Sequence, residues 1–135
     1  MSVQVFADTH ALIWYLFDAD RLSAEGRAAL DGAVAAGFPI LVSAISIIEI
    51  IYLEEKRKIS TGSTERIRQA CEAEDPSIEI VPIDARVAYG IHDVARTEVP
   101  DMPDRIIAAT AVTLGVPLVT RDHKIRTSGV HTIRA

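Results

Sequence analysis

The sequence predicts an α/β fold, a three-layer α/β/α domain whose central sheet is mostly parallel. Short apolar runs alternate with longer segments of helical spacing throughout the 135 residues. Runs that lack alternating polar residues are typical of strands covered on both faces, as in parallel sheets. No repeat and no linker rich in Pro, Gly or Ser interrupts this alternation, so we expect a single domain over residues 1–135.

The first half of the chain opens with a buried strand followed by a helix. The run VQVFA predicts the strand, and the sequence DAD marks the end of the helix. Ser23 is a suitable N-cap for the next helix, and Gly37 suits the position just after its end. The expected elements are a strand at residues 3–7, helices at 9–17 and 24–36, a strand at 40–43, and helices at 44–58 and 63–73.

The second half repeats the alternation of strands and helices. Asp75 and Pro76 mark a turn, Asp84 is an expected N-cap, and Gly115 closes a later helix. The expected elements are a strand at residues 78–83, a helix at 85–96, a loop at 97–103, a helix at 104–114, and strands at 118–120 and 130–133.

Composition narrows the class of protein. Hydrophobic residues make up 49% of the chain, enough for a well-filled core. Cys71 is the only cysteine, which excludes an internal disulfide framework and fits a reducing cytoplasm. The sequence contains no recognisable signal peptide and no apolar run long enough for a membrane span, so a cytoplasmic protein is expected. The net charge of −5 argues weakly against a nucleic-acid partner, although an acidic cation site would contribute to it.

Four carboxylates beside apolar segments carry the strongest functional signal. Asp8 and Asp122 follow predicted strands, and Asp104 opens a helix. Glu49 is the only charged residue in the run FPILVSAISIIEIIYL, where a carboxylate is expected to lose hydration. Ligands of open α/β sheets bind at the carboxyl ends of the strands, near the point where strand order reverses. We therefore expect all four side chains to meet at that edge of the sheet.

Such a cluster of acids predicts a metal site. Carboxylates in one pocket repel each other unless a cation intervenes. Mg²⁺ or Mn²⁺ suits the cluster because hard cations prefer oxygen ligands. A metal held there can generate a hydroxide and stabilise the charge that develops on a phosphodiester. The sequence therefore predicts metal-dependent hydrolysis of a nucleic-acid backbone.

Three of the acids also have a purely structural interpretation. Asp8 could cap the helix that follows it, and Asp104 could stabilise its own helix through the macrodipole. Asp122 could be an ordinary surface turn residue. Asp101, three residues before Asp104, is interpreted as a turn or supporting residue.

Side chains beside the acids are candidate supporting residues. Three hydroxyls could orient the ligands or hold a metal-bound water, although capping or core-edge roles are simpler for each: Thr9, Ser46 and Thr120. Arg105 and Arg121 are candidates for substrate contact because they adjoin two of the acids. Either arginine is also the main alternative partner of Glu49, in a buried ion pair. The histidines show no zinc spacing, and Trp14 is expected in the core or at an interface.

Four segments resemble the signature segments of PIN domains, in the branch of VapC-like toxin ribonucleases. They are FADTHALIWYL, SAISIIEI, MPDRIIAATA and GVPLVTRDHKI. They occur in the family's order and at its spacing, and the resemblance covers about residues 3–126. The loop PDMPD departs from many relatives, which leaves the role of Asp101 open.

The resemblance implies a bacterial or archaeal endoribonuclease that depends on Mg²⁺ or Mn²⁺, the toxin of a type II toxin–antitoxin pair. It implies that Asp8 and Asp104 bind the metal most directly. Glu49 and Asp122 would then help by ligation or through bound water, with hydroxyl support. The implied partners are an RNA substrate, a second copy in a homodimer, and a cognate antitoxin that docks near the active site and inhibits it.

Two other interpretations remain open. One is a PIN-like nuclease of RNA processing, or one acting on DNA, outside any toxin pair. The other is a PIN-like module that binds RNA or protein without cleaving. The complete set of four acids argues against the second, because a binding module has no need to gather carboxylates that repel each other.

Overall fold

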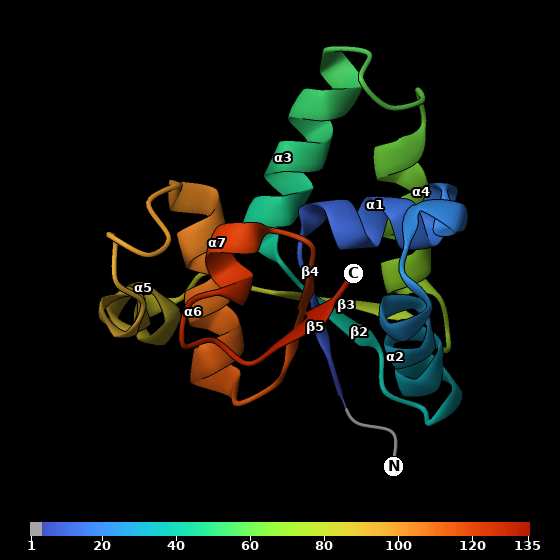
Figure 1. Cartoon of the computed structure of the whole chain (residues 1–135). Helices are drawn as coiled ribbons and strands as arrows, with labels where there is room; N and C mark the ends of the chain where they lie inside the picture. The colour runs from blue at the N-terminus through green and yellow to red at the C-terminus, as the bar shows by residue number, and fades with distance from the viewer. Residues whose placement is uncertain (1–3) are drawn as a thin grey trace.

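The fold is an α/β/α sandwich on a five-stranded sheet (Figure 1). The computed structural model describes residues 4–135. In chain order the elements are β1 (Phe6–Ala7), α1 (Thr9–Phe17), the 3₁₀ helix η1 (Ala19–Arg21), α2 (Ala24–Ala35), β2 (Ile40–Ser43), α3 (Ala44–Glu55), α4 (Ser63–Glu72), β3 (Ile78–Val81), α5 (Ala85–Gly90), the 3₁₀ helix η2 (Ile91–Asp93), α6 (Met102–Leu114), β4 (Leu118–Thr120), α7 (His123–Arg126) and β5 (Thr132–Arg134). Every strand pairing is parallel, which confirms the expected α/β class.

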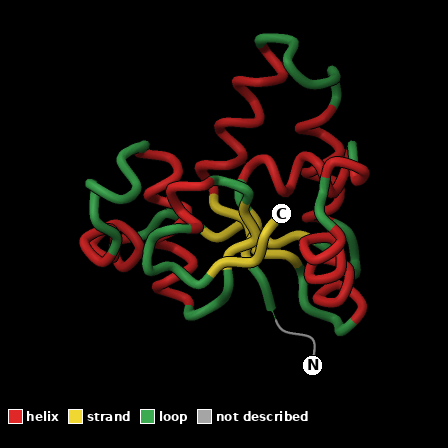
Figure 2. The backbone as a smooth tube through the Cα atoms, in the orientation of Figure 1, coloured by secondary structure: helices red, strands yellow, loops and turns green. Residues whose placement is uncertain are grey.

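The sheet contributes to two apolar cores, one on either face. Ala7 and Val119 pack with residues of α1, α2, α3 and α4. Their strand neighbours Phe6 and Leu118 point the other way and pack with residues of α6 and α7. Figures 1 and 2 show the strands between these two helical layers, with α5 beyond α6. Within the described chain, no helix is both long enough and apolar enough to cross a membrane.

The strand order places the reversal point at β1. The sheet runs β3-β2-β1-β4-β5, so β1 lies between β2 and β4 at the centre. A crevice at the carboxyl ends of strands beside such a reversal is the usual ligand position in open α/β sheets. Asp8 follows β1 directly, and Asp122 lies two residues beyond β4. The topology therefore brings together two residues that are far apart in sequence.

Several predicted boundaries are confirmed. The strands at 40–43 and 118–120 and the helix at 9–17 coincide with β2, β4 and α1. Ser23 caps α2 and Asp84 caps α5 through their side-chain oxygens. Gly37 has a φ of 86°, the left-handed conformation expected after the end of α2.

Other predicted boundaries are wrong. The helix expected over 85–96 stops at Gly90 and continues as η2. The strand expected to reach residue 83 ends at Val81, and the last strand covers Thr132–Arg134 rather than 130–133. The helix expected to reach residue 58 ends at Glu55. The strand expected over 3–7 covers only Phe6–Ala7 among the described residues, and residue 3 lies outside them.

Two differences affect the candidate site. α6 begins two residues earlier than expected, at Met102, because Asp101 is its N-cap. α7 was not predicted, and its N-cap is Asp122. Both helices begin at the carboxyl edge of the sheet, so their first turns face the crevice at β1 and β4.

Candidate active site

Asp8 joins the end of β1 to the start of α1 and is 7% exposed. Its Oδ1 accepts a hydrogen bond of 2.8 Å from the amide of Ala11, and its Oδ2 accepts one of 2.5 Å from the hydroxyl of Thr120. Burial raises the pKa of Asp8, against the effect of these two hydrogen bonds. The carboxylate of Asp8 thus caps α1 with Oδ1, while Oδ2 contacts Thr120 at the end of β4.

Asp122 occupies the equivalent place after β4. Its Oδ1 accepts a hydrogen bond of 2.9 Å from the amide of Ile125, which caps α7. Its own amide donates to the hydroxyl of Thr120 at 3.0 Å. Thr120 is fully buried and connects the two acids, since the same hydroxyl donates to Asp8.

Asp104 lies in the first turn of α6, but it does not cap that helix. Asp101 does so, by accepting a hydrogen bond of 3.2 Å from the amide of Asp104. The pKa of Asp104 is raised to about 7 by burial first, and then by the charges of Asp101, Asp122, Asp8 and Glu49. A helix N-terminus favours the ionised form, so burial and repulsion outweigh the dipole here. The other three predicted acids therefore lie within electrostatic reach of Asp104.

Glu49, on α3, is held by a chain of hydroxyls. The hydroxyl of Thr9 lies 2.6 Å from Oε1 of Glu49 and 2.9 Å from Oγ of Ser46. A hydroxyl has one proton and a carboxylate only accepts, so Thr9 donates to Glu49 and Ser46 donates to Thr9. Thr9 and Ser46 are buried, which fixes the orientation of the partly exposed carboxylate.

The surroundings of Glu49 are more exposed than the sequence suggested. α3 extends past the sheet (Figure 1), and Ile48 and Tyr52 on it are 48% and 58% exposed. Among the described residues, Glu49 forms no ion pair with Arg105 or Arg121, the alternative that the sequence left open. Ile50 remains fully buried, so the apolar neighbours of Glu49 are divided between the core and an accessible surface.

Three of the four acids share one pocket of about 180 Å³, which is lined by Asp8, His10, Trp14, Asp104, Arg121 and Asp122. Glu49 and Thr9 instead line an adjoining pocket of about 460 Å³. His10 lines both pockets. The predicted acids therefore gather at one edge of the sheet, with Glu49 on the adjacent side.

This arrangement belongs to a known family. The family model of the PIN domain matches residues 5–129. The chain is a member of the PIN domain family. PIN domains are nucleases, hydrolases that act on nucleic acids, and they generally use divalent metal ions.

Solved structures share the PIN fold over nearly the whole chain. VapBC2 from Rickettsia felis, bound to a DNA fragment from their promoter, has a TM-score of 0.69 and 17% identity, and covers 97% of this chain and 100% of that chain. A toxin–antitoxin complex from Klebsiella pneumoniae has a TM-score of 0.63 and 25% identity over 98% and 97%. FitAcB from Neisseria gonorrhoeae has a TM-score of 0.65 and 22% identity over 97% of each chain. No curated protein matches the sequence.

The acids of this PIN domain fit a divalent cation that keeps part of its water shell. Within residues 4–135, no three His, Cys, Asp or Glu side chains form a complete ligand set. Mg²⁺ does not need one, because it commonly uses one or two carboxylates together with waters and substrate phosphates. Burial is the main reason for the raised pKa of Asp104, and the surrounding negative charge, which a cation would compensate, raises that pKa further. The oxygen donors of Asp8, Asp104 and Asp122 suit Mg²⁺ or Mn²⁺ better than zinc.

The two candidate arginines have different surroundings. Arg105 donates from Nε to the carbonyl of Val94 at 2.8 Å and from Nη2 to the carbonyl of Ile91 at 3.3 Å. These bonds tie α6 to the segment around η2, on a side of the helix away from the acid pocket. Arg121 does line the pocket, and its guanidinium lies 4.4 Å from the centre of the Trp14 ring.

His10 and Trp14 are lining residues to which the sequence assigned no role in the site. Both belong to α1, four residues apart, and their ring centres are 5.8 Å apart. The spacing i, i+4 puts them on one face of the helix that Asp8 caps. That spacing was the available signal, but only the fold shows that this face borders the acids.

Proposed function

We propose that this PIN domain is an endoribonuclease that depends on Mg²⁺ or Mn²⁺ and serves as the toxin of a type II toxin–antitoxin pair in the cytoplasm. The observation that supports it best is the convergence of Asp8, Asp104 and Asp122 on one pocket beside the strand-order reversal. The similarity to the Klebsiella pneumoniae structure, which is described as a toxin–antitoxin complex, supports the toxin assignment.

In the proposed mechanism, the acids divide the work according to their surroundings. Asp8 and Asp104 would hold the cation, and Asp104 would have to lose its proton to do so. A bound divalent cation would lower the pKa of a water and stabilise charge on the phosphodiester. Asp122, just after β4, adds its carboxylate to the same pocket. Glu49, in the adjacent pocket, would orient a water molecule.

Neighbouring side chains support these acids. Thr120 fixes Asp8, and the hydroxyls of Ser46 and Thr9 fix Glu49. Arg121 lines the pocket with its guanidinium held by the carbonyls of Arg21 and Ala135, so its positive charge would act on a substrate phosphate from a fixed position. Arg105 supports the site less directly, by tying α6 to η2 behind Asp104.

We propose that the antitoxin docks in the pocket beside Glu49. Apolar side chains that are exposed in the chain line it, including Ile48, Tyr52 and Met102. Apolar anchors of a partner protein would cover these side chains and leave Glu49 inaccessible. We also propose that the toxin forms a homodimer. Sedimentation equilibrium of the toxin without its antitoxin would measure its oligomeric state.

Cleavage of RNA tests the function directly. Wild type and Asp104→Asn are incubated with total bacterial RNA and with single-stranded DNA, in Mg²⁺, in Mn²⁺ and in a chelator. We expect metal-dependent cutting of RNA by the wild type only. Asp75→Asn, at an exposed turn, is the matched control and should cut normally. Cutting of DNA in preference to RNA would support the DNA nuclease, and no cutting with no metal binding would support the binding module.

The toxin assignment has its own test. Induced expression of the wild type should arrest bacterial growth, and co-expression of the small gene next to it should restore growth. Arrest that Asp104→Asn produces equally would contradict a mechanism based on cleavage. A nuclease active in vitro that never arrests growth would instead point to RNA processing.

A further inference from the structure

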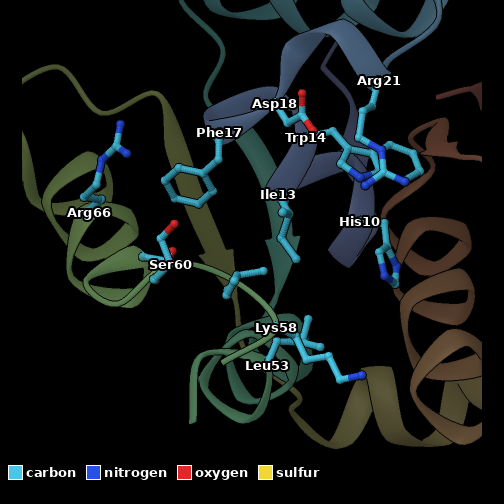
Figure 3. A pocket seen from close by; sticks show the side chains of 12 residues that line it. His10, Ile13, Trp14, Phe17, Asp18, Arg21, Leu53, Lys58, Ser60 and Arg66 are labelled. Atoms are coloured by element: carbon cyan, nitrogen blue, oxygen red, sulfur yellow. The ribbon is translucent and has the colours of Figure 1, made fainter. Parts of the chain in front are cut away.

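We propose that a second pocket, beside the acid pocket, binds the single-stranded RNA segment that adjoins the scissile phosphate. The pocket measures about 470 Å³ and lies between α1, the end of α3 and the start of α4. The proposal rests on the proposed ribonuclease function and names the surface that holds its substrate. Apart from His10 and Trp14, the lining residues of this second pocket lie outside the acid pocket, and Figure 3 shows them.

The two pockets are continuous along α1. His10 and Trp14 line both of them. Ile13 and Phe17 extend the same stripe, so positions i, i+3, i+4 and i+7 of one helix face form the wall. From His10 to Phe17 this wall runs for about 10 Å along the helix axis. A chain held at the acid pocket can therefore continue directly along the wall.

The charge of the second pocket favours a polyanion. Arg21, Lys58 and Arg66 line it, and Asp18 is the only acid among its lining residues within the described chain. The protein as a whole carries a net charge of −5, so this local excess of cations runs against the overall balance. Phosphates are the expected partners of such a cluster.

Flat side chains stand beside these cations. The guanidinium of Arg66 lies 4.7 Å from the centre of the Phe17 ring, and that of Arg21 lies 5.1 Å from the Trp14 ring. Figure 3 shows Phe17 and Trp14 along α1, with Lys58 coming from the opposite wall. Grooves that bind single strands without sequence preference combine cations for the backbone with aromatic and guanidinium planes for the bases. The pocket has both components: Trp14 is only 9% exposed, so the accessible planes are Phe17 and the guanidinium groups of Arg21 and Arg66.

The ends of α3 and α4 explain why Lys58 faces α1. Arg57 has a φ of 59°, which ends α3 and redirects the chain. The amide of Lys58 then donates to the carbonyl of Leu53 at 2.8 Å, and Glu54 accepts from the amide of Thr64 at 2.8 Å. These bonds fix the connection from α3 to α4. Lys58 and Arg66 are therefore presented by an ordered connection, although both side chains are exposed.

The test uses RNA binding by a protein that cannot cleave. In an Asp104→Asn background with Mg²⁺, we compare Lys58→Ala/Arg66→Ala with the matched double variant Arg27→Ala/Arg68→Ala. The control also removes two exposed positive charges, both of them arginines in ion pairs at 3.9 Å and 3.8 Å on α2 and α4, outside the pocket. All four side chains are exposed, so both proteins should fold, which circular dichroism checks. The probe is a short, fluorescently labelled, single-stranded RNA of mixed sequence.

We expect the pocket variant to bind the RNA about tenfold more weakly, with a salt dependence whose logarithmic slope is shallower by about 1.4, because two phosphate contacts are lost. The control should stay within about twofold of its parent, since exposed ion pairs contribute little. Trp14, the only tryptophan, should report the RNA by a change in emission that the pocket variant loses.

Three results would overturn the proposal. Equal RNA binding by both double variants would show that the pocket does not contact the RNA, and it would not affect the proposed ribonuclease function. Normal RNA binding by the pocket variant together with a lost response to the antitoxin would reassign the pocket to the protein partner. Failure of the Asp104→Asn parent itself to bind RNA at low salt would reject the RNA substrate, and the proposed function with it.

Discussion

The hydroxyl of Thr120 donates a hydrogen bond of 2.5 Å to Oδ2 of Asp8, although 112 residues separate the two in sequence. Both residues are buried, at the carboxyl ends of adjacent strands. The bond favours the ionised form of Asp8 and partly offsets the burial that raises its pKa. The central pair of strands thus sets both the position and the charge of one acid.

Thr120→Val should weaken folding and metal binding together. The change keeps the shape of the side chain but leaves Oδ2 of Asp8 without its donor, which costs about 1–3 kcal/mol in the free energy of unfolding. The pKa of Asp8 should rise further, so Mn²⁺ should bind more weakly near neutral pH. Urea unfolding and calorimetry measure the two effects. Thr110→Val, which removes a buried hydroxyl bonded within α6, is the control and should leave metal affinity unchanged.

Asp104→Asn should stabilise the metal-free protein at high pH. The folded-state pKa of Asp104, about 7, lies above its ordinary value of 3.8, so the folded protein holds this proton more tightly than the unfolded chain does. The contribution of Asp104 to stability therefore falls as pH rises through this interval. We expect the variant to be more stable than wild type above pH 7, with the difference vanishing below about pH 4. Urea unfolding measures the difference. If the variant is less stable than wild type both above pH 7 and below about pH 4, Asp104 has a structural role instead.

Metal affinity should rise with pH up to about 7 and then level off. Because Asp104 must be deprotonated to bind, affinity should fall by about tenfold for each pH unit below its pKa if one proton is displaced. Calorimetry with Mg²⁺ and Mn²⁺, repeated in buffers of different ionisation enthalpy, gives both the affinity and the protons released. A metal affinity that stays constant between about pH 5.5 and about pH 7.5 would contradict the raised pKa of Asp104.

Substitutions of Asp101 should separate its cap from its charge. Asp101→Ala removes the cap of α6 and should cost about 0.5–2 kcal/mol of stability, whereas Asp101→Asn keeps a capping oxygen. Both remove a like charge, so both should lower the pKa of Asp104 and move the pH profile of metal binding to lower pH. Equal stability of the two variants would show that the cap contributes little.

The sheet was predictable because its central strands are continuous apolar runs. β2 and β4 are buried at every position, and each follows a proline and ends at a hydroxyl residue, so local sequence defines both ends. The end of α3 was not predictable in the same way. It closes at Arg57, which adopts a positive φ that usually favours glycine, and the amide of Lys58 bonds back to Leu53. No residue type in that segment indicates such a turn.

The site was predictable as a set of residue types but not as an arrangement. Local sequence offered Asp8 as either a cap or a ligand, and the structure shows that its two oxygens face different partners. Glu49 was expected to be enclosed by isoleucines. Its actual exposure depends on how far α3 extends past the sheet, which is a property of packing between distant segments.

The distribution of helix caps determines which mutations a cell could use to escape the proposed toxicity. Asp8 and Asp122 are each the N-cap of a helix, whereas α6 is capped by Asp101 and not by Asp104. Surviving colonies from a selection against growth arrest should therefore contain full-length, stable protein when the lesion is at Asp104. Lesions at Asp8 should instead reduce the amount of protein as well as its activity. Inactive alleles suitable as harmless binding partners for the antitoxin would accordingly come from the first turn of α6.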